Sequence, residues 1–386
     1  MRTAKIKKAF FAAITLMLAC YLFFLVAYAD EQGESEKMPD EYGDFIGSLP
    51  DDVADKLGGA ITDDIGEVSD AAIALSSAEN IINILIDLFL GQIKDALPTL
   101  AIILGVVIIS AVLHTLSSSF AGGLSGVIEL CTRICTYSVI AGTAISSVLS
   151  LSKYFSSLFT AVAAFLPLSA TLYAMGGNLT LAATSGAGIS VILTVCQFIC
   201  TYTVIPVFCV CLCLSLMSVF DGVFSFAGNT ISGNIKKWYN IALGLVMTLL
   251  TTSLATQTIV ASRADGVAMR GLKFAAGSFI PISGGAVSST LGTLASSVGL
   301  IRGSVGVVGI IALILMLLPT LLSLAVRRLT YGIAEICAGL LSATAEQKLL
   351  GEIGSLYGYL EGVAVLCSAV FIIALAIFGS VASPIS

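Results

Sequence analysis

The chain has 386 residues, of which 57% are hydrophobic and only 11% charged, and its mean hydropathy is +1.03. Soluble domains carry about 25% charged residues, so the composition excludes a soluble domain and indicates an integral membrane protein. The formal net charge of −6 gives no indication that nucleic acid or anionic lipid is a partner. We expect an all-α fold, that of a polytopic helical membrane protein.

The first 29 residues are typical of a cleaved signal peptide. Four cations between residues 2 and 8 precede an apolar stretch from Phe10 to Val26, and Ala27-Tyr28-Ala29 offers the small-x-small pattern of a cleavage site. One alternative is an uncleaved first membrane span. Another is lipoprotein processing at Cys20, although Tyr21-Leu22-Phe23-Phe24 continues the apolar stretch where a lipoprotein turns polar.

Cleavage after Ala29 is therefore the first prediction. N-terminal sequencing of protein purified from membranes is expected to begin at Asp30. A sequence that begins at Met1, or an acylated Cys20, would contradict it.

An acidic segment follows. Residues 30–70 contain fourteen Asp or Glu against Lys37 and Lys56, which is typical of a solvated, partly flexible face. From Asp70, apolar residues recur at three- and four-residue spacing, which predicts an amphipathic helix that ends near Pro98. We assign residues 30–96 to an acidic extracytoplasmic segment with this helix.

Residues 97–386 form the predicted multispan membrane domain, with about seven or eight spans. Spans of about 20 residues are long enough to cross a bilayer. With the acidic segment outside, eight spans place Lys236, Lys237, Arg327, Arg328 and Lys348 on the cytoplasmic side, in accord with the positive-inside bias. Arg263, Arg270 and Lys273 then fall outside, against that bias unless their segment is structured. The region 181–220 also fits one long tilted helix. The eight predicted spans are Leu97–Leu116, Val127–Leu149, Phe155–Met175, Leu181–Tyr202, Thr203–Phe220, Ile241–Ala261, Ser304–Val326 and Glu361–Ser380.

Residues 263–303 do not have the pattern of an ordinary membrane-spanning helix. Charges crowd the front of this stretch, and Pro281 and a glycine pair follow in an apolar run. The pattern predicts a short basic helix to Gly277, a stop at Phe279-Ile280-Pro281 and a turn at the glycines. Such a broken or re-entrant segment is typical of substrate or gating regions, although two interfacial helices joined by a loop fit as well. The candidate gating or conduit residues are Arg263, Asp265, Arg270, Lys273, Pro281, Gly284 and Gly285.

Two further groups are candidates for structural roles. Glu129 and Arg133 lie one helical turn apart and predict an intramembrane ion pair. Gly354, Gly358 and Gly362 repeat every four residues, which is typical of close helix packing in lipid; the partner helix is either within the chain or on another subunit.

No catalytic, cofactor-binding or metal-binding set is predicted. Nine cysteines from Cys131 to Cys367 lie in or beside apolar segments, and the chain has one histidine, His114, which is too few ligands of the right kind for a zinc site. The string Gly123-Leu124-Ser125-Gly126 resembles that of intramembrane serine proteases, but His114 precedes it and flanks the same loop. Neither a metalloprotease H-E-x-x-H nor a P-loop lysine pattern occurs.

The stretch "ADGVAMRGLKFAAGSFIPISGG", followed by "LIRGSVGVVG" and an apolar run that ends in proline, resembles the C-terminal core of the stage III sporulation protein AE family. The resemblance is strongest over residues 262–345. It implies a multispan platform or permease-like core in the mother-cell membrane facing the forespore. It also implies partners among the other stage III sporulation A-operon proteins, including a secretion-type ATPase and ring-forming proteins, with no nucleic acid.

The expected function is therefore that of a non-enzymatic membrane component of the mother cell–forespore channel or feeding apparatus needed during endospore formation. The alternative is a permease-like secondary transporter of small solutes. Inverted repeats with paired broken helices would favour the alternative, and the sequence shows one broken region.

Overall fold

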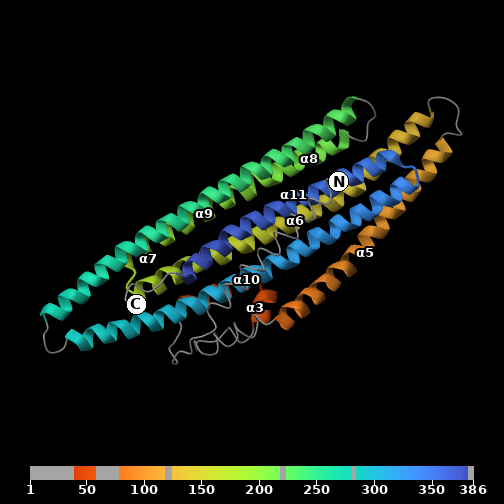
Figure 1. The fold of residues 1–386 in the computed structure, drawn as a ribbon. Coiled ribbons are helices and arrows are strands. Elements are labelled where there is room, and N and C mark those ends of the chain that lie inside the picture. Colours follow the sequence, from red (N-terminus) through yellow and green to blue (C-terminus); the bar gives the residue numbers. More distant parts are fainter. Residues whose placement is uncertain (1–38, 58–77, 118–123, 218–222, 280–283, 381–386) are drawn as a thin grey trace.

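The computed structural model describes residues 39–57, 78–117, 124–217, 223–279 and 284–380, and every element in these ranges is a helix. The predicted signal peptide lies outside the described residues. Figure 1 shows the long helices lying alongside one another. In chain order the helices are α2 (Asp40–Gly47), α3 (Asp51–Leu57), α5 (Ala78–Ser117), α6 (Leu124–Met175), α7 (Leu179–Ile199), the π-helix η2 (Cys200–Val204), α8 (Ile205–Met217), α9 (Val223–Phe279), α10 (Gly284–Leu340) and α11 (Thr344–Ser380).

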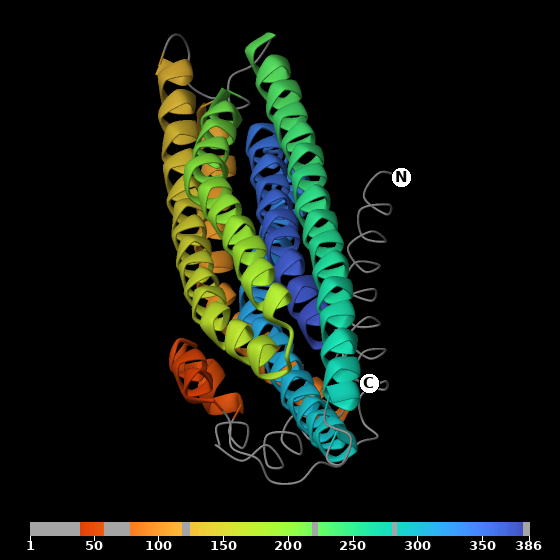
Figure 2. The ribbon, with the colours of Figure 1, turned by 90° about the vertical axis from the view of Figure 1, so that its left-hand side faces the viewer.

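The long helices run side by side, and contacts between residues distant in sequence define two ends of the bundle (Figure 2). At one end, Thr171 of α6 donates a hydrogen bond to Glu41 of α2 at 3.0 Å. At the other end, Tyr137 of α6 donates to the carbonyl oxygen of Leu212 in α8 at 3.0 Å. We call these the α2 end and the α8 end.

Helices α10 and α11 form the centre. In their most apolar windows 67% and 56% of the residues are buried, against 22% in α5 and in α9. Small residues let the two central helices approach each other, since a Cβ added at Gly306 would lie 3.2 Å from the Cα of Gly379. The outer helices α5 and α9 therefore present most of their apolar side chains outward, for example Leu97 and Leu249.

Six helical stretches of the described residues are long and apolar enough to cross a membrane, where eight spans were expected. The predicted spans Val127–Leu149 and Phe155–Met175 lie on one helix, α6, because residues 150–154 contain neither glycine nor proline and bury Leu151 and Tyr154. At 1.5 Å per residue α6 is about 78 Å long. This length is more than twice the thickness of a bilayer's hydrocarbon core, about 30 Å, so α6 extends beyond one bilayer.

Prolines do not end the helices where we expected. Pro98 lies inside α5, so the predicted amphipathic helix and the first predicted span are one helix. Residues 181–217 are likewise continuous from α7 to α8, and the π-helical turn Cys200–Val204 lies just before Ile205 and Pro206. A proline removes one backbone hydrogen bond, whereas a loop within an apolar layer leaves several backbone groups without partners. Continuation of the helix is therefore favoured.

The region 263–303 also differs from the expectation. Residues 263–279 are the last turns of α9, continuous with the predicted span Ile241–Ala261, and residues 284–303 are the first turns of α10. Helix α9 extends at least to Phe279, and the predicted stop at Ile280-Pro281 lies outside the described residues. Gly284 and Gly285 lie in a helix and do not form the turn. Nothing between Ala261 and Arg263 interrupts α9, so the basic residues belong to this long helix. In this region the chain reverses direction only between α9 and α10.

Part of the acidic segment folds onto the bundle. Phe45 of α2 packs edge-to-face on Phe165 of α6 with ring centres 5.7 Å apart, and Val53 and Leu57 of α3 are buried. Burial raises the pKa of the Tyr42 phenol above its ordinary range. Residues 40–57 are thus a structured cover at the α2 end, where we had expected a flexible, solvated face.

Candidate functional site

Asp265 of α9 caps the N-terminus of α7. Its carboxylate oxygens accept hydrogen bonds from the backbone amides of Thr180 and Leu181, each at 2.9 Å, and the residue is 4% exposed. The first amides of a helix have no partner within it and carry partial positive charge, which favours a carboxylate. Asn178, at the N-cap of α7, makes no side-chain cap bond. The cap of α7 therefore comes from a residue 84 positions along the chain.

The turn between α6 and α7 is shaped to reach this cap. Gly177 has a φ of +75°, in the left-handed region that glycine adopts without steric cost. A Cβ added there would collide with the end of the Met269 side chain on α9. Glycine thus lets the turn fit closely against α9, and this contact places the first amides of α7 at Asp265.

A buried arginine lies at the same end. Arg302 of α10 is 2% exposed, and its guanidinium carbon lies 5.4 Å from the centre of the Tyr173 ring on α6. A guanidinium over an aromatic face is attracted by the ring's quadrupole, more so away from water. This contact ties the first part of α10 to the last turn of α6 at the α2 end.

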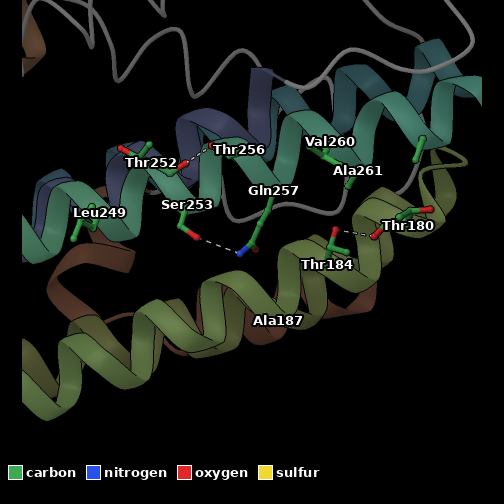
Figure 3. A pocket seen from close by; sticks show the side chains of 11 residues that line it. Thr180, Thr184, Ala187, Leu249, Thr252, Ser253, Thr256, Gln257, Val260 and Ala261 are labelled. Carbon is green, nitrogen blue, oxygen red and sulfur yellow. Dashed lines mark hydrogen bonds between the residues drawn. The ribbon is translucent and has the colours of Figure 1, made fainter.

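A groove of about 690 Å³ runs between α7 and α9 (Figure 3). Thr184, Thr252 and Thr256 donate their hydroxyl protons at 2.8 Å to carbonyl oxygens of their own helices, so these protons are not available to a bound molecule. Small and aliphatic residues supply much of the remaining wall. The groove therefore suits an apolar occupant. Its other lining residues include Thr180, Ala187, Leu249, Val260, Ala261 and Ala264.

Helix α7 packs closely against α9 at Gly188. A Cβ there would lie 2.9 Å from Oε1 of Gln257 and 3.0 Å from Cδ1 of Leu254. The Gln257 side chain in turn donates to the hydroxyl of Ser253 at 3.3 Å. Gln257 also lines the groove, so this contact adjoins it.

Among the residues that the structure describes, Lys236–Glu352 and Arg328–Glu361 are ion pairs that join other helices to α11 in the half of the bundle toward the α8 end. Lys236 of α9 lies 3.0 Å from Glu352, and Arg328 of α10 lies 2.9 Å from Glu361, whose side chain is only 4% exposed. Both acids belong to α11, which therefore anchors α9 and α10 through charge. In apolar surroundings such pairs fix which helices are neighbours, since lipid tails are as apolar as leucine.

The glycine row of α11 faces these same partners. A Cβ at Gly358 would lie 3.2 Å from the guanidinium carbon of Arg328, and one at Gly354 would lie 3.9 Å from Cβ of Tyr331. A Cβ at Gly362 would lie 3.6 Å from the Asn240 side chain of α9. The structure places all three glycines against helices of the same chain.

A layer of tyrosines and hydroxyls connects α6 to the two central helices. Tyr331 and Tyr357 stack with ring centres 5.2 Å apart. Ser147 of α6 bonds to the Tyr357 hydroxyl at 2.8 Å and accepts from Arg327 at 3.0 Å. Thr143 bonds to the Tyr331 hydroxyl. The centre of the bundle is therefore filled with side chains at this level.

The structure separates the candidate gating residues. Asp265 is buried at the cap, whereas Arg263 and Arg270 are exposed on α9. Lys273 lies on α9 and Gly284 and Gly285 lie in the first turn of α10; the side chain of Lys273 and the surroundings of these glycines fall outside the described part of the structure, as does Pro281.

The proposed pair of Glu129 and Arg133 can be placed only in part. Both residues lie on α6, but the side chain of Glu129 is not among those described. Arg133 lines a small cavity of about 70 Å³ together with Ser110 and Glu346, and the Ser110 hydroxyl donates to Glu346. The structure thus brings Arg133 near a different acid, from α11.

Sequence reasoning missed the α7–α9 groove, the contact of Arg302 with Tyr173 and the two ion pairs of α11. A signal for Arg302 was present, because a lone arginine in a long apolar segment needs a partner. The groove had none, since threonine, serine and alanine at helical spacing also describe ordinary helix packing.

Among the described residues, no three His, Cys, Asp or Glu lie close enough together to hold a metal ion. The buried thiols of Cys200 and Cys367 lie 3.4 Å apart, and the neighbouring polar groups are serine and tyrosine hydroxyls. The chemistry that the described sites offer is therefore hydrogen bonding, ion pairing and apolar contact.

The model of the family described as stage III sporulation protein AE matches residues 65–382. The chain belongs to this family. No curated protein and no solved structure matches the chain. The match covers every long helix, so the groove, the Asp265 cap and the charges of α11 all lie in the part shared with the stage III sporulation protein AE family. Helices α2 and α3 precede that part.

Family membership gives the protein a role in sporulation, and the six candidate spans make it a multi-pass membrane protein. The stage III sporulation protein AE family thus accounts for the class of protein predicted from composition. Other sporulation proteins are plausible partners for a member of this family.

Proposed function

We propose that this protein is a non-enzymatic membrane component of the channel or feeding apparatus between mother cell and forespore. The observation that carries the proposal is the family match over residues 65–382, which includes all six candidate spans. We place it in the mother-cell membrane facing the forespore, with the other A-operon proteins, a secretion-type ATPase and ring-forming proteins among them, as its partners.

The packing of the bundle supports a role as part of a larger assembly. Buried side chains such as Tyr331, Tyr357 and Phe371 fill the space around α10 and α11, whereas α5, α7 and α9 expose large apolar side chains outward, including Phe89, Phe198 and Trp238. One chain alone therefore offers outer surfaces for lipid and other subunits, and a conduit would be built by several chains together.

The distribution of charge supports an orientation. The acidic helices α2 and α3 pack at the α2 end, and the exposed Lys237 and Lys348 lie toward the α8 end. The exposed Arg263 and Arg270 lie toward the α2 end, so the acidic helices support the orientation more strongly than the cations do. Cytoplasmic loops carry an excess of lysine and arginine. We therefore place the α8 end in the cytoplasm, accessible to an ATPase, and the α2 end outside the cytoplasm, toward the ring-forming proteins.

The alternative function is that of a permease-like transporter of small solutes, and the α7–α9 groove is the observation that favours it. However, the groove lies between two outer helices, and three of its threonine hydroxyls are bonded to their own backbone. Transporter sites for polar solutes instead lie between bundles and offer free polar groups.

The test has two parts: complementation in a spore-forming host, and solute uptake by the purified protein in vesicles. In a spore-forming host that lacks its own copy, the full chain is expected to restore development past engulfment and to copurify with other membrane sporulation proteins. The same chain in vesicles is expected to show no solute uptake by itself. Solute uptake by the chain alone would support the permease, and restored development without any copurifying sporulation protein would contradict a role in the assembly.

A further inference from the structure

The α7–α9 groove continues toward two exposed cations. Arg263 follows Thr256 by seven residues, and Arg270 follows Arg263 by seven. Seven residues are almost two full helical turns, so both arginines lie on the face of α9 that carries Thr256. Arg263 is next to the last lining residue, Ala264, and Arg270 lies beyond it. The groove is therefore apolar, and Arg263 and Arg270 form a cationic rim at one end of it.

Among the contacts that the structure describes, none joins Arg263 or Arg270 to an acidic side chain. Asp265, between the two arginines in sequence, is buried and accepts both of its described hydrogen bonds from the amides of α7. Its carboxylate offsets the partial positive charge of the α7 N-terminus, so Arg263 and Arg270 are the groups that attract an anion here. The α2 end of the groove therefore attracts an anion.

The position along the helices matches the edge of a membrane. The candidate span of α7 begins at Leu179 and that of α9 ends at Gly271, so Arg263 and Arg270 lie in the last turns of an apolar stretch. Arginines at such positions extend toward lipid headgroups. From Leu249 to Ala264 the groove extends about 22 Å along α9, away from the headgroup level and into the apolar layer.

We propose that this groove is a binding site for an anionic phospholipid, whose phosphate lies between Arg263 and Arg270 and whose acyl chain lies between α7 and α9. Basic sites between membrane helices recognise such headgroups. The net charge of −6 for the whole chain conceals the site, because the acids that outnumber the cations lie mainly in residues 30–70.

The size of the groove favours an acyl chain over a helix of another protein. A helix 10 Å across and 22 Å long occupies roughly 1,700 Å³, and the groove of about 690 Å³ holds less than half of that. In addition, α7 contributes lining residues only from Thr180 to Ala187, about two helical turns. A narrow, flexible chain fits these walls.

The test measures which lipids stay bound. Full-length protein is exchanged into mixed vesicles of phosphatidylglycerol and phosphatidylcholine with identical acyl chains, extracted in mild detergent and analysed by native mass spectrometry. The protein is expected to retain phosphatidylglycerol preferentially. Changing both Arg263→Gln and Arg270→Gln is expected to lower that retention about thirtyfold, since each surface cation contributes about fivefold.

Two further variants separate the charge from the groove. Lys237→Gln with Lys348→Gln removes the same charge from exposed positions toward the α8 end and is expected to leave the retention close to that of the wild type. Ala187→Phe places a large side chain in the groove and is expected to weaken retention of both lipids. Circular dichroism verifies that each variant keeps its helical content.

Several outcomes would overturn the proposal. Equal retention of the two lipids excludes the anionic site, and so does unchanged retention after loss of both arginines or an equal loss in the lysine variant. A photoreactive amino acid in place of Val260 is expected to form an adduct with the mass of a lipid. An adduct with another protein or a second copy of the chain would instead show that a helix occupies the groove.

Discussion

Leucine in place of Arg328 is expected to destabilise the protein by about 3 kcal/mol, the lower end of the cost of breaking a buried ion pair. Glu361 is 3% exposed and accepts from Arg328 at 2.9 Å. The arginine side chain is itself 35% exposed, so solvent weakens the attraction within the pair. Most of the cost arises because the variant leaves a charged carboxylate in apolar surroundings. The measurement is the midpoint of thermal unfolding in detergent, monitored by circular dichroism.

Two controls make this result specific to the charge on Glu361. Arg327→Leu removes the neighbouring cation, which donates to the neutral hydroxyl of Ser147 at 3.0 Å, and is expected to cost about 1 kcal/mol. Adding Glu361→Gln to the Arg328 variant is expected to recover most of the lost stability. Equal losses in the two arginine variants, with no recovery in the double variant, would show that the pair does not hold α10 to α11.

Alanine in place of Asp265 is expected to cost about 3 kcal/mol, because two hydrogen bonds to a charged acceptor are lost and each contributes about 1.5 kcal/mol. The loss is expected to be local. The amides of Thr180 and Leu181 would have no acceptor at the start of α7, so the first turn of this helix is expected to open more often. Hydrogen exchange of peptides that cover residues 177–185 measures this opening directly.

Asparagine at position 265 provides the graded comparison. Its single carbonyl oxygen still accepts one amide, so about half of the loss is expected. Arg263→Ala, an exposed change two residues earlier on α9, is expected to leave the exchange of α7 unchanged. If Asp265→Ala protects residues 177–185 as well as the wild type does, the carboxylate does not cap α7 and its burial needs another explanation.

The two variants affect different ends of the bundle. Asp265 joins α9 to α7 near the α2 end, and Arg328 joins α10 to α11 toward the α8 end. Because apolar contact between helices in lipid selects neighbours only weakly, directional contacts of this kind specify the arrangement. Their loss is therefore expected to affect the pairing of particular helices more than the amount of helix.

Local sequence properties determined the class of the protein and several of its boundaries. Composition predicted an all-α membrane protein, and all described elements are helices, with six candidate spans. The predicted span Phe155–Met175 ends at the residue where α6 ends. The family was recognisable from residues 262–345 for the same reason, since it depends on the order of residues along the chain and not on contacts. These features are local, and a local pattern is sufficient to predict them.

Contacts between distant residues decided the rest. The sequence shows Asp265 as one charge in a basic stretch, and only the fold brings it to the amides of Thr180 and Leu181. Pro98 reads as a helix end, yet α5 continues through it, because interrupting a helix in an apolar layer costs more than one missing hydrogen bond. The groove beside Arg263 exists only because α7 and α9 lie side by side. A sequence specifies such sites through packing, and packing depends on residues that no single stretch of the chain contains.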